Sequence, residues 1–143
     1  MYLLLLIALG LVIAVYDWRF RRIPNILVLL YVAVRILFLI IKFNYIIFIE
    51  SLIGMAFAFL IFLIPKLLKM TIGWGDIKYS AAIGFALGFP NYVCSMIICL
   101  ICSVIYLLFR KYAMKKDIKE YPLPLGSFMS IGSILILTVN IIL

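Results

Sequence analysis

Long apolar runs, interrupted by only three charged stretches, constrain this chain more than any other feature of its sequence. Hydrophobic residues make up 69% of its 143 residues and charged residues 13%, whereas soluble domains are about 45–50% apolar and about 25% charged. A water-soluble globule cannot bury so much apolar surface, and disordered chains are polar and poor in aromatic residues. We therefore expect one small membrane domain over residues 1–143, made of several short spans.

Six apolar segments can be distinguished along the chain. Crossing a hydrocarbon core of about 30 Å takes roughly 17–25 residues of helix. Only helices or a closed barrel satisfy the backbone there, and the segments lack the alternating pattern of barrel strands. The turn residues Gly88, Pro90 and Asn91 separate the fourth segment from the fifth. The sequence therefore predicts an all-α bundle of six transmembrane helices, at residues 2–16, 25–43, 46–64, 77–89, 91–109 and 124–143.

The basic residues predict the orientation of this bundle. The chain has 13 Lys and Arg against 5 Asp and Glu, a net charge of +8, and loops rich in Lys and Arg face the cytoplasm. If both termini lie outside, 11 of the 13 basic residues are cytoplasmic, and only Arg35 and Lys42 are not. The charge follows the first span, which favours a retained span over a cleaved signal peptide. We expect a multi-pass protein of the cell membrane whose charge reflects topology rather than binding to nucleic acid.

The chain contains no histidine, which excludes a histidine-based catalytic triad and a histidine-ligated zinc site. Its three cysteines, Cys94, Cys99 and Cys102, lie in one apolar segment. A single Cys-x-x-Cys without a second pair is a weak metal signal, so these thiols are expected to pack inside a helix. We expect neither a metal nor a cofactor.

Acidic residues bound the two shortest apolar segments. Asp17 follows segment 2–16, and Asp76 precedes segment 77–89. Short helices draw their flanking residues into the bilayer, so both carboxylates are expected at or just inside the same cytoplasmic interface. An acid at that depth is costly and indicates a functional site.

Two carboxylates close together share a proton, because they cannot both ionise. One can then act as general base on a water while the other donates a hydrogen bond to a carbonyl. The alternative is a pair of loop charges solvated among Lys and Arg. The helix dipoles favour an ionised Asp76 and a protonated Asp17, whereas Arg19, Arg21 and Arg22 favour the opposite assignment, so this point stays open.

Three motifs give the chain a resemblance to a known family. The segment from Asp17 to Asn25, Asp-Trp-Arg-Phe-Arg-Arg-Ile-Pro-Asn, resembles the first aspartate motif of the type IV prepilin peptidases. The segment from Gly73 to Lys78, Gly-Trp-Gly-Asp-Ile-Lys, resembles their Gly-x-Gly-Asp motif, and residues 122–128 resemble the entry to their last helix. The resemblance implies an intramembrane aspartic endopeptidase. It would remove the short basic leader of prepilin-like or preflagellin-like substrates at the cytoplasmic face, with Asp17 and Asp76 as the catalytic pair.

Several neighbours of the two aspartates are candidates for supporting the site. Gly73 and Gly75 would let the backbone pass close to a bound peptide. Pro24 and Asn25 would start the second helix or shape the active-site loop. Lys78, two residues beyond Asp76, faces away from it on a helix and would be an interfacial anchor or a catalytic neighbour. The resemblance is to the short form of the family, without the N-terminal region associated with N-methylation.

Two other functions remain possible from the sequence. A presenilin-like protease shares the Gly-x-Gly-Asp pattern, although six spans and the spacing of Ile23, Pro24 and Asn25 argue against it. A small proton-coupled transporter or channel subunit could use the same carboxylates, although transport favours acids spread along a path through the membrane. The sequence leaves the oligomeric state open.

Two further patterns concern packing rather than chemistry. Arg35 lies deep in the second segment and Glu50 in the outer half of the third, and we expect them to form a buried ion pair. The small-residue patterns Gly54-x-x-x-Ala58 and Gly84-x-x-x-Gly88 favour close contact between helices of one bundle.

Overall fold

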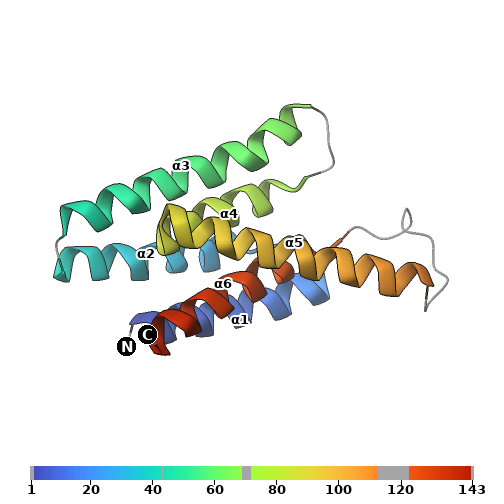
Figure 1. Ribbon diagram of the computed structural model, residues 1–143, viewed down its shortest axis with the longest axis horizontal. Coiled ribbons are helices and arrows are strands. Elements are labelled where there is room, and N and C mark those ends of the chain that lie inside the picture. Colours follow the sequence, from blue (N-terminus) through green and yellow to red (C-terminus); the bar gives the residue numbers. More distant parts are fainter. Residues whose placement is uncertain (1, 43, 69–71, 113–122, 143) are drawn as a thin grey trace.

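The computed structural model describes residues 2–42, 44–68, 72–112 and 123–142. Within these ranges the chain is all-helical, as predicted, and contains no strand (Figure 1). Six α-helices follow one another: α1 (Tyr2–Phe20), α2 (Asn25–Ile41), α3 (Tyr45–Leu67), α4 (Trp74–Leu87), α5 (Phe89–Tyr112) and α6 (Leu125–Ile142).

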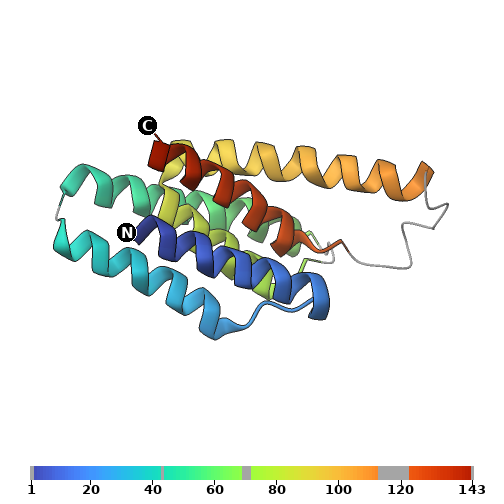
Figure 2. The same ribbon diagram turned by 90° about the horizontal axis from the view of Figure 1, so that it is seen from below.

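Consecutive helices run in opposite directions (Figures 1 and 2). The end of α1 and the starts of α2, α4 and α6 therefore lie at one end of the bundle, which we call the site end. The start of α1 and the end of α6 lie together at the opposite end. This arrangement agrees with the predicted placement of both termini on one side of a membrane.

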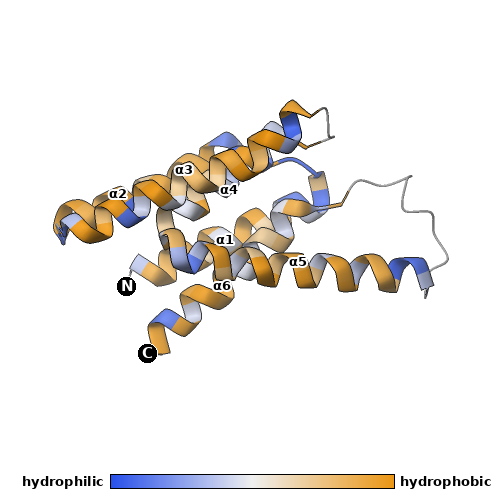
Figure 3. Cartoon of the chain, turned by 45° about the horizontal axis from the view of Figure 1, so that its top comes forward, coloured by the Kyte–Doolittle hydropathy of each residue, from blue (hydrophilic) through white to orange (hydrophobic). Residues whose placement is uncertain are grey.

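Four helices are long and apolar enough to cross a membrane, namely α1, α3, α5 and α6. Helix α2 is apolar but has 17 residues, and α4 has 14. Apolar side chains cover most of the outer faces of the bundle (Figure 3). An exposed apolar surface of this extent is typical of a protein whose solvent is lipid.

Two helix ends differ from the prediction in a way that matters for the site. Helix α1 continues past residue 16 to Phe20, and α4 begins at Trp74 rather than at residue 77. Hydropathy marks where a segment stops being apolar, but a helix continues until its backbone is interrupted. In α1 that happens at Arg21, which has the left-handed φ of 54° and donates its backbone N–H to the Asp17 carbonyl.

The turn predicted between the fourth and fifth segments is present. Helix α4 ends at Leu87, and Gly88 adopts a φ of 78°, a conformation that residues with a side chain rarely tolerate. Its backbone N–H still bonds the Gly84 carbonyl, and α5 starts at once with Phe89. Two helices therefore form where an uninterrupted apolar run could have given one.

Helix α4 lies at the centre of the bundle and packs against α2, α3, α5 and α6. Its closest contact is with α3, where a Cβ added at Gly54 or at Gly84 would clash with the backbone of the other glycine. The predicted small-residue contact thus forms within one bundle. Because backbone meets backbone there, the two helices can approach more closely than larger side chains would permit.

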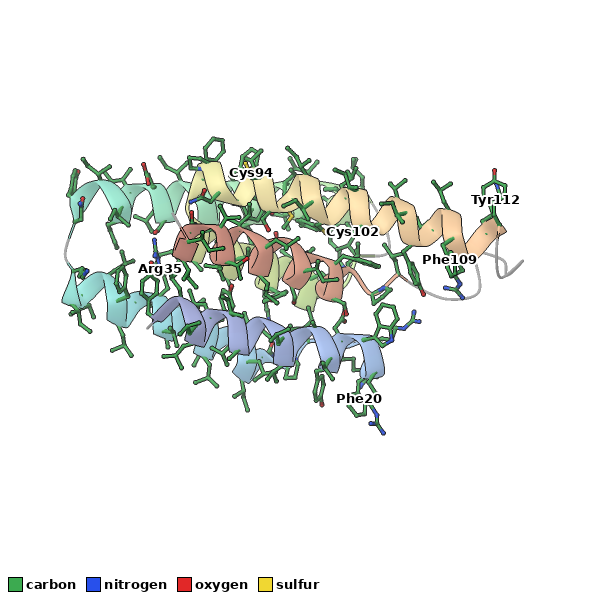
Figure 4. All side chains as sticks on the ribbon, turned by 60° about the horizontal axis from the view of Figure 1, so that its bottom comes forward. Phe20, Arg35, Cys94, Cys102, Phe109 and Tyr112 are labelled. Atoms are coloured by element: carbon green, nitrogen blue, oxygen red, sulfur yellow. The ribbon has the colours of Figure 1, made fainter. Side chains whose placement is uncertain are left out.

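The expected buried ion pair between Arg35 and Glu50 is wrong. Arg35 is 6% exposed and points from α2 towards α3 (Figure 4), where it donates a hydrogen bond of 3.1 Å to Ser51 Oγ. Glu50 is exposed on the adjacent position of α3. Neighbouring residues on a helix differ by about 100° in direction, so only one of the two can face Arg35.

Candidate active site

Asp17 lies in the last turn of α1 and is only 4% exposed. Its Oδ2 accepts a hydrogen bond of 2.9 Å from the backbone N–H of Ser127 and lies 3.2 Å from Ser127 Oγ. The Ser127 amide is available because backbone N–H groups in the first turn of a helix have no helical acceptor. The carboxylate at the end of α1 therefore caps the start of α6.

Gly126 makes this approach possible. A Cβ at position 126 would lie 3.0 Å from the Asp17 carboxyl carbon and 2.7 Å from Ile23 Cδ1. Both distances are shorter than ordinary van der Waals contacts between heavy atoms. A glycine here thus lets the first turn of α6 lie directly against the carboxyl group.

Asp76 lies in the first turn of α4, which Gly73 precedes as the N-cap residue. The Asp76 carboxylate turns back and accepts the backbone N–H of Gly73, as the acidic residue of a capping box does. A Cβ at Gly73 would lie 3.0 Å from Asp76 Oδ2. The first glycine of the motif therefore leaves room for the side chain of the aspartate that follows it.

Asp17 and Asp76 both belong to the site end of the bundle, where α1 ends and α4 and α6 begin (Figure 2). Ile23, in the short connection from α1 to α2, lies against the first turns of both α4 and α6. A Cβ at Gly75 would be 3.4 Å from Ile23 Cβ, and the one at Gly126 would reach the tip of the same side chain. The structure thus brings together the two motifs that the sequence singled out.

The charge of Asp17 acts on Asp76. Burial raises the pKa of Asp76 to about 6, and the negative charge of Asp17 adds to this rise. The Gly73 N–H and the positive charge of Lys66 act in the opposite direction but do not cancel it. Asp76 therefore keeps its proton to higher pH than an exposed aspartate does.

Lys66, near the end of α3, is a neighbour of the site that the sequence did not single out. Its ammonium group donates to the Ile72 carbonyl and lies 5.3 Å from the centre of the Trp74 ring. The side chain thus spans from α3 to the residues just before α4 and brings a positive charge towards Asp76. Nothing in the spacing of the sequence distinguishes Lys66 from the other interfacial lysines.

Lys78 and Asn25 pair with each other rather than with the carboxyl groups. Lys78 Nζ donates to Asn25 Oδ1 over 3.4 Å, and both side chains are exposed. Pro24 is the N-cap of α2, and its carbonyl accepts the Leu27 amide at 3.1 Å. Lys78 and Asn25 thus connect α4 to the start of α2 beside the site. Gly75 makes a second contact between the same two regions, with Ile23.

Buried hydroxyl groups lie one turn deeper than the carboxyl groups. The Tyr79 hydroxyl is 2.8 Å from Ser130 Oγ, and Ser130 donates to the Gly126 carbonyl at 2.9 Å. Tyr79 follows Asp76 by three residues and Ser130 follows Ser127 by three, so this bond fixes α4 against α6 just below the site. Sequence reasoning missed Ser127, Ser130 and Tyr79, because serines and tyrosines are common in membrane helices.

Parts of the predicted site fall outside the described residues. Pro122, the first residue of the third motif, is one of them, as is most of the charged stretch that precedes α6. Within the described ranges, no group of three or more Cys, Asp and Glu side chains could hold a metal ion.

A helical bundle with long apolar helices and two interacting carboxyl groups at one end defines a membrane protein with a polar site at one surface. Residues 4–109 match the model of the type IV leader peptidase family, and the chain therefore belongs to that family. The matched range contains both Asp17 and Asp76, whereas α6 lies beyond it. No curated protein and no solved structure matches the chain.

Membership of this family confirms the resemblance seen in the first two motifs, whereas the third motif, at residues 122–128, lies beyond the matched range. It makes the chain a leader peptidase, a hydrolase acting on pilin-like proteins in a membrane environment.

Proposed function

We propose that this chain is an intramembrane aspartic endopeptidase whose catalytic pair is Asp17 and Asp76. The observation that carries the proposal is the meeting of these two carboxyl groups, from helices far apart in the sequence, at one end of the bundle. A pair of this kind can hydrolyse a peptide bond without histidine, serine, cysteine or a metal.

The pair would act on a water molecule held between the two carboxyl groups. The ionised carboxylate takes a proton from the water, and the water oxygen attacks the scissile carbonyl carbon. At the same time the protonated carboxyl gives its proton to the carbonyl oxygen. The tetrahedral intermediate then returns a proton to that second aspartate. The first aspartate passes its proton to the leaving amine as the C–N bond breaks, so no covalent acyl-enzyme forms.

The substrates that we propose are prepilin-like proteins: type IV pilins, Flp pilins or preflagellins with a short basic leader. Arg19, Arg21, Arg22 and Lys66 lie at the site end, which supports a cytoplasmic position for that end in the cell membrane. Cleavage would then occur where the leader meets the apolar helix of the substrate. All six helices would enter or cross the bilayer, with the short α4 drawing Asp76 towards the head groups.

The neighbouring residues would support the pair in different ways. Gly73 and Gly75 would let an extended peptide approach the backbone at the start of α4. Pro24, Asn25 and Lys78 would hold the start of α2 against α4, and we assign them a supporting role rather than a chemical one.

A proton-coupled transporter or channel subunit is less well supported. Transport would use acidic groups along a path through the membrane. Among the described residues, Asp17 and Asp76 lie together at one end, and Glu50 is exposed in α3.

The test is cleavage of a leader-bearing substrate by the purified protein in detergent or liposomes. A panel of one type IV prepilin, one Flp prepilin and one preflagellin would be incubated with the wild type and with Asp17→Asn and Asp76→Asn variants. We expect the wild type to cleave at least one substrate and either variant to lose about a thousandfold or more in rate. Full activity in one variant would remove that aspartate from the mechanism, and an inactive wild type would contradict the proposal for these substrates.

A further inference from the structure

We infer that Ser127 is a positioning residue that holds Asp17 as the ionised member of the pair, so that the shared proton resides on Asp76. This inference rests on the proposed function and assigns Asp17 as general base and Asp76 as general acid. It also decides between the two protonation assignments that the sequence leaves open.

The fixed donor in this arrangement is the backbone N–H of Ser127. It points at Asp17 Oδ2 from 2.9 Å and cannot rotate away, because it belongs to the first turn of α6. Oδ2 therefore acts as an acceptor, and a proton on this carboxyl group could only sit on Oδ1. The partial positive charge at the start of α6 favours a negative charge on the carboxyl group, which accepts this N–H more strongly when it is ionised.

The side chain of Ser127 supplies an adjustable donor. Its Oγ lies 2.9 Å from the Ala14 carbonyl and 3.2 Å from Asp17 Oδ2, and its single proton can go to only one of them at a time. Hydrogen bonds to an ionised acceptor are stronger than those to a neutral one. The hydroxyl thus turns to Asp17 when that group is ionised and to Ala14 when it is not.

Asp76 has a weaker set of donors. One backbone N–H, that of Gly73, bonds its carboxyl group, while the Lys66 ammonium makes its own hydrogen bond to the Ile72 carbonyl. Two adjacent carboxyl groups cannot both ionise. The group with the better hydrogen-bond donors takes the charge, and the other keeps the proton. Asp17 has the better donors, even though it is more deeply buried than Asp76.

The other titratable groups around the pair are distributed over several elements. Tyr79 on α4 faces Asp17 from below, and Lys66 on α3 acts on Asp76. The exposed Arg21 and Arg22 follow Asp17 along the chain. On α5, Arg110 lies one turn beyond Tyr106, whose ring packs 5.4 Å from that of Phe128.

The first experiment measures the order in which the two groups titrate. The chain has only three aspartates, Asp17, Asp76 and Asp117, so carbon-13 labelling at aspartate Cγ gives three carboxyl signals that Asp→Asn variants assign. In the full-length protein in detergent micelles we expect Asp17 to ionise at lower pH than Asp76. The reverse order would overturn the inference, and this measurement does not depend on whether any substrate is cleaved.

The second experiment tests the serine itself through the pH profile of cleavage. In Ser127→Ala the acidic limb of the kcat/KM profile should move up by about one pH unit, because the ionised Asp17 loses a charged hydrogen bond. Ser127→Thr should restore the wild-type limb, and Ser103→Ala, at a buried serine of α5 that donates to the Cys99 carbonyl of its own helix, should leave it in place.

The outcomes separate this inference from the proposed function. If the wild type cleaves and the Asp→Asn variants do not, the proposed function stands. An unmoved acidic limb in a folded Ser127→Ala variant would then overturn only the role of Ser127. If Ser127→Ala fails to fold, the order of titration in the wild type still decides.

Discussion

The hydroxyl groups of Tyr79 and Ser130 lie 2.8 Å apart, joining α4 to α6 one turn below the two carboxyl groups. Both side chains are fully buried, so the hydrogen bond cannot exchange with water. Asp76 is three residues before Tyr79, and Ser127 is three residues before Ser130. Asp76 is carried by α4, and Asp17 is bound to α6 through Ser127. The contact between Tyr79 and Ser130 therefore helps to set how far apart the two carboxyl groups lie.

We predict that Tyr79→Phe loosens the site more than it destabilises the fold. The ring remains, and Ser130 keeps its bond to the Gly126 carbonyl, so the free energy of unfolding should fall by only about 1 kcal/mol. Cleavage should slow by about tenfold or more, because a small displacement of catalytic groups is costly. Thermal unfolding and kcat measured together check this. Ser80→Ala, which breaks the Ser80–Tyr92 contact on the other face of α4, is the control and should change stability without a comparable change in kcat.

A second prediction concerns the pH dependence of the wild type. The pKa of Asp76 is raised to about 6 by burial and by the charge of Asp17, and Asp76 must be protonated to act as general acid. Activity should therefore be present below this pKa and be lost as the pH rises through it. The kcat/KM of a short soluble substrate peptide should fall about tenfold per pH unit on this limb.

The control for this limb is Lys66→Met, which removes a positive charge that lowers the pKa of Asp76. The alkaline limb should then move to higher pH while the acidic limb stays in place. A limb that moves to lower pH, or a wild-type profile without an alkaline limb, would contradict the assignment of Asp76 as the acid.

Gly126→Ala should inactivate the protein while leaving most of the bundle intact. The new Cβ would lie 3.0 Å from the Asp17 carboxyl carbon and 2.7 Å from Ile23 Cδ1. The flexible tip of Ile23 can move, but the carboxyl group must then shift from the Ser127 amide. A displacement of this size can cost about a hundredfold in rate.

The matched control is Gly10→Ala in α1, two turns before Asp17, where the added Cβ would be 3.3 Å from Ile134 Cγ1 and only in ordinary contact, 4.0 Å, with the Tyr79 hydroxyl. We expect near wild-type cleavage from it, together with far-UV circular dichroism like that of Gly126→Ala. Equal activity in the two alanine variants would show that the close approach of α6 to Asp17 is not needed.

Much of this fold follows from the sequence, because apolar runs of this length have few alternatives to helices in lipid. The number of helices, the turn at Gly88 and close helix contact through the small-residue faces that contain Gly54 and Gly84 were all predicted from local patterns. The meeting of the two motifs was also predicted, since it requires only that the charged stretches gather on one side. Each of these depends on segment length, turn residues or charge, which are properties of short pieces of chain.

The sequence did not predict which way individual side chains point, although it did predict where along the chain the helices lie. Asp17 belongs inside α1 and faces inward, which hydropathy does not reveal because Trp18, Arg19 and Phe20 follow it in the same helix. The Ser127 contact joins residues 110 positions apart, and its donor is a backbone amide that no side-chain pattern encodes. The donors to Asp17 come from the start of α6, a helix that does not carry either aspartate, so the dipoles of α1 and α4 alone do not decide which group is ionised.

The last prediction concerns the partner of the buried Arg35. The structure shows Ser51, whereas the sequence favoured Glu50. Arg35 donates to Ser51 Oγ at 3.1 Å, and its guanidinium lies 5.8 Å from the centre of the Phe38 ring. A double-mutant cycle of Arg35→Met with Ser51→Ala should give a coupling energy of about 1 kcal/mol or more, because the bond is charged and buried. The cycle with Glu50→Gln should give less than about 0.5 kcal/mol, because an exposed carboxylate gains little from a charge that it does not contact. Unfolding measured in one detergent by one denaturant series checks both cycles, and a larger coupling to Glu50 than to Ser51 would restore the ion pair.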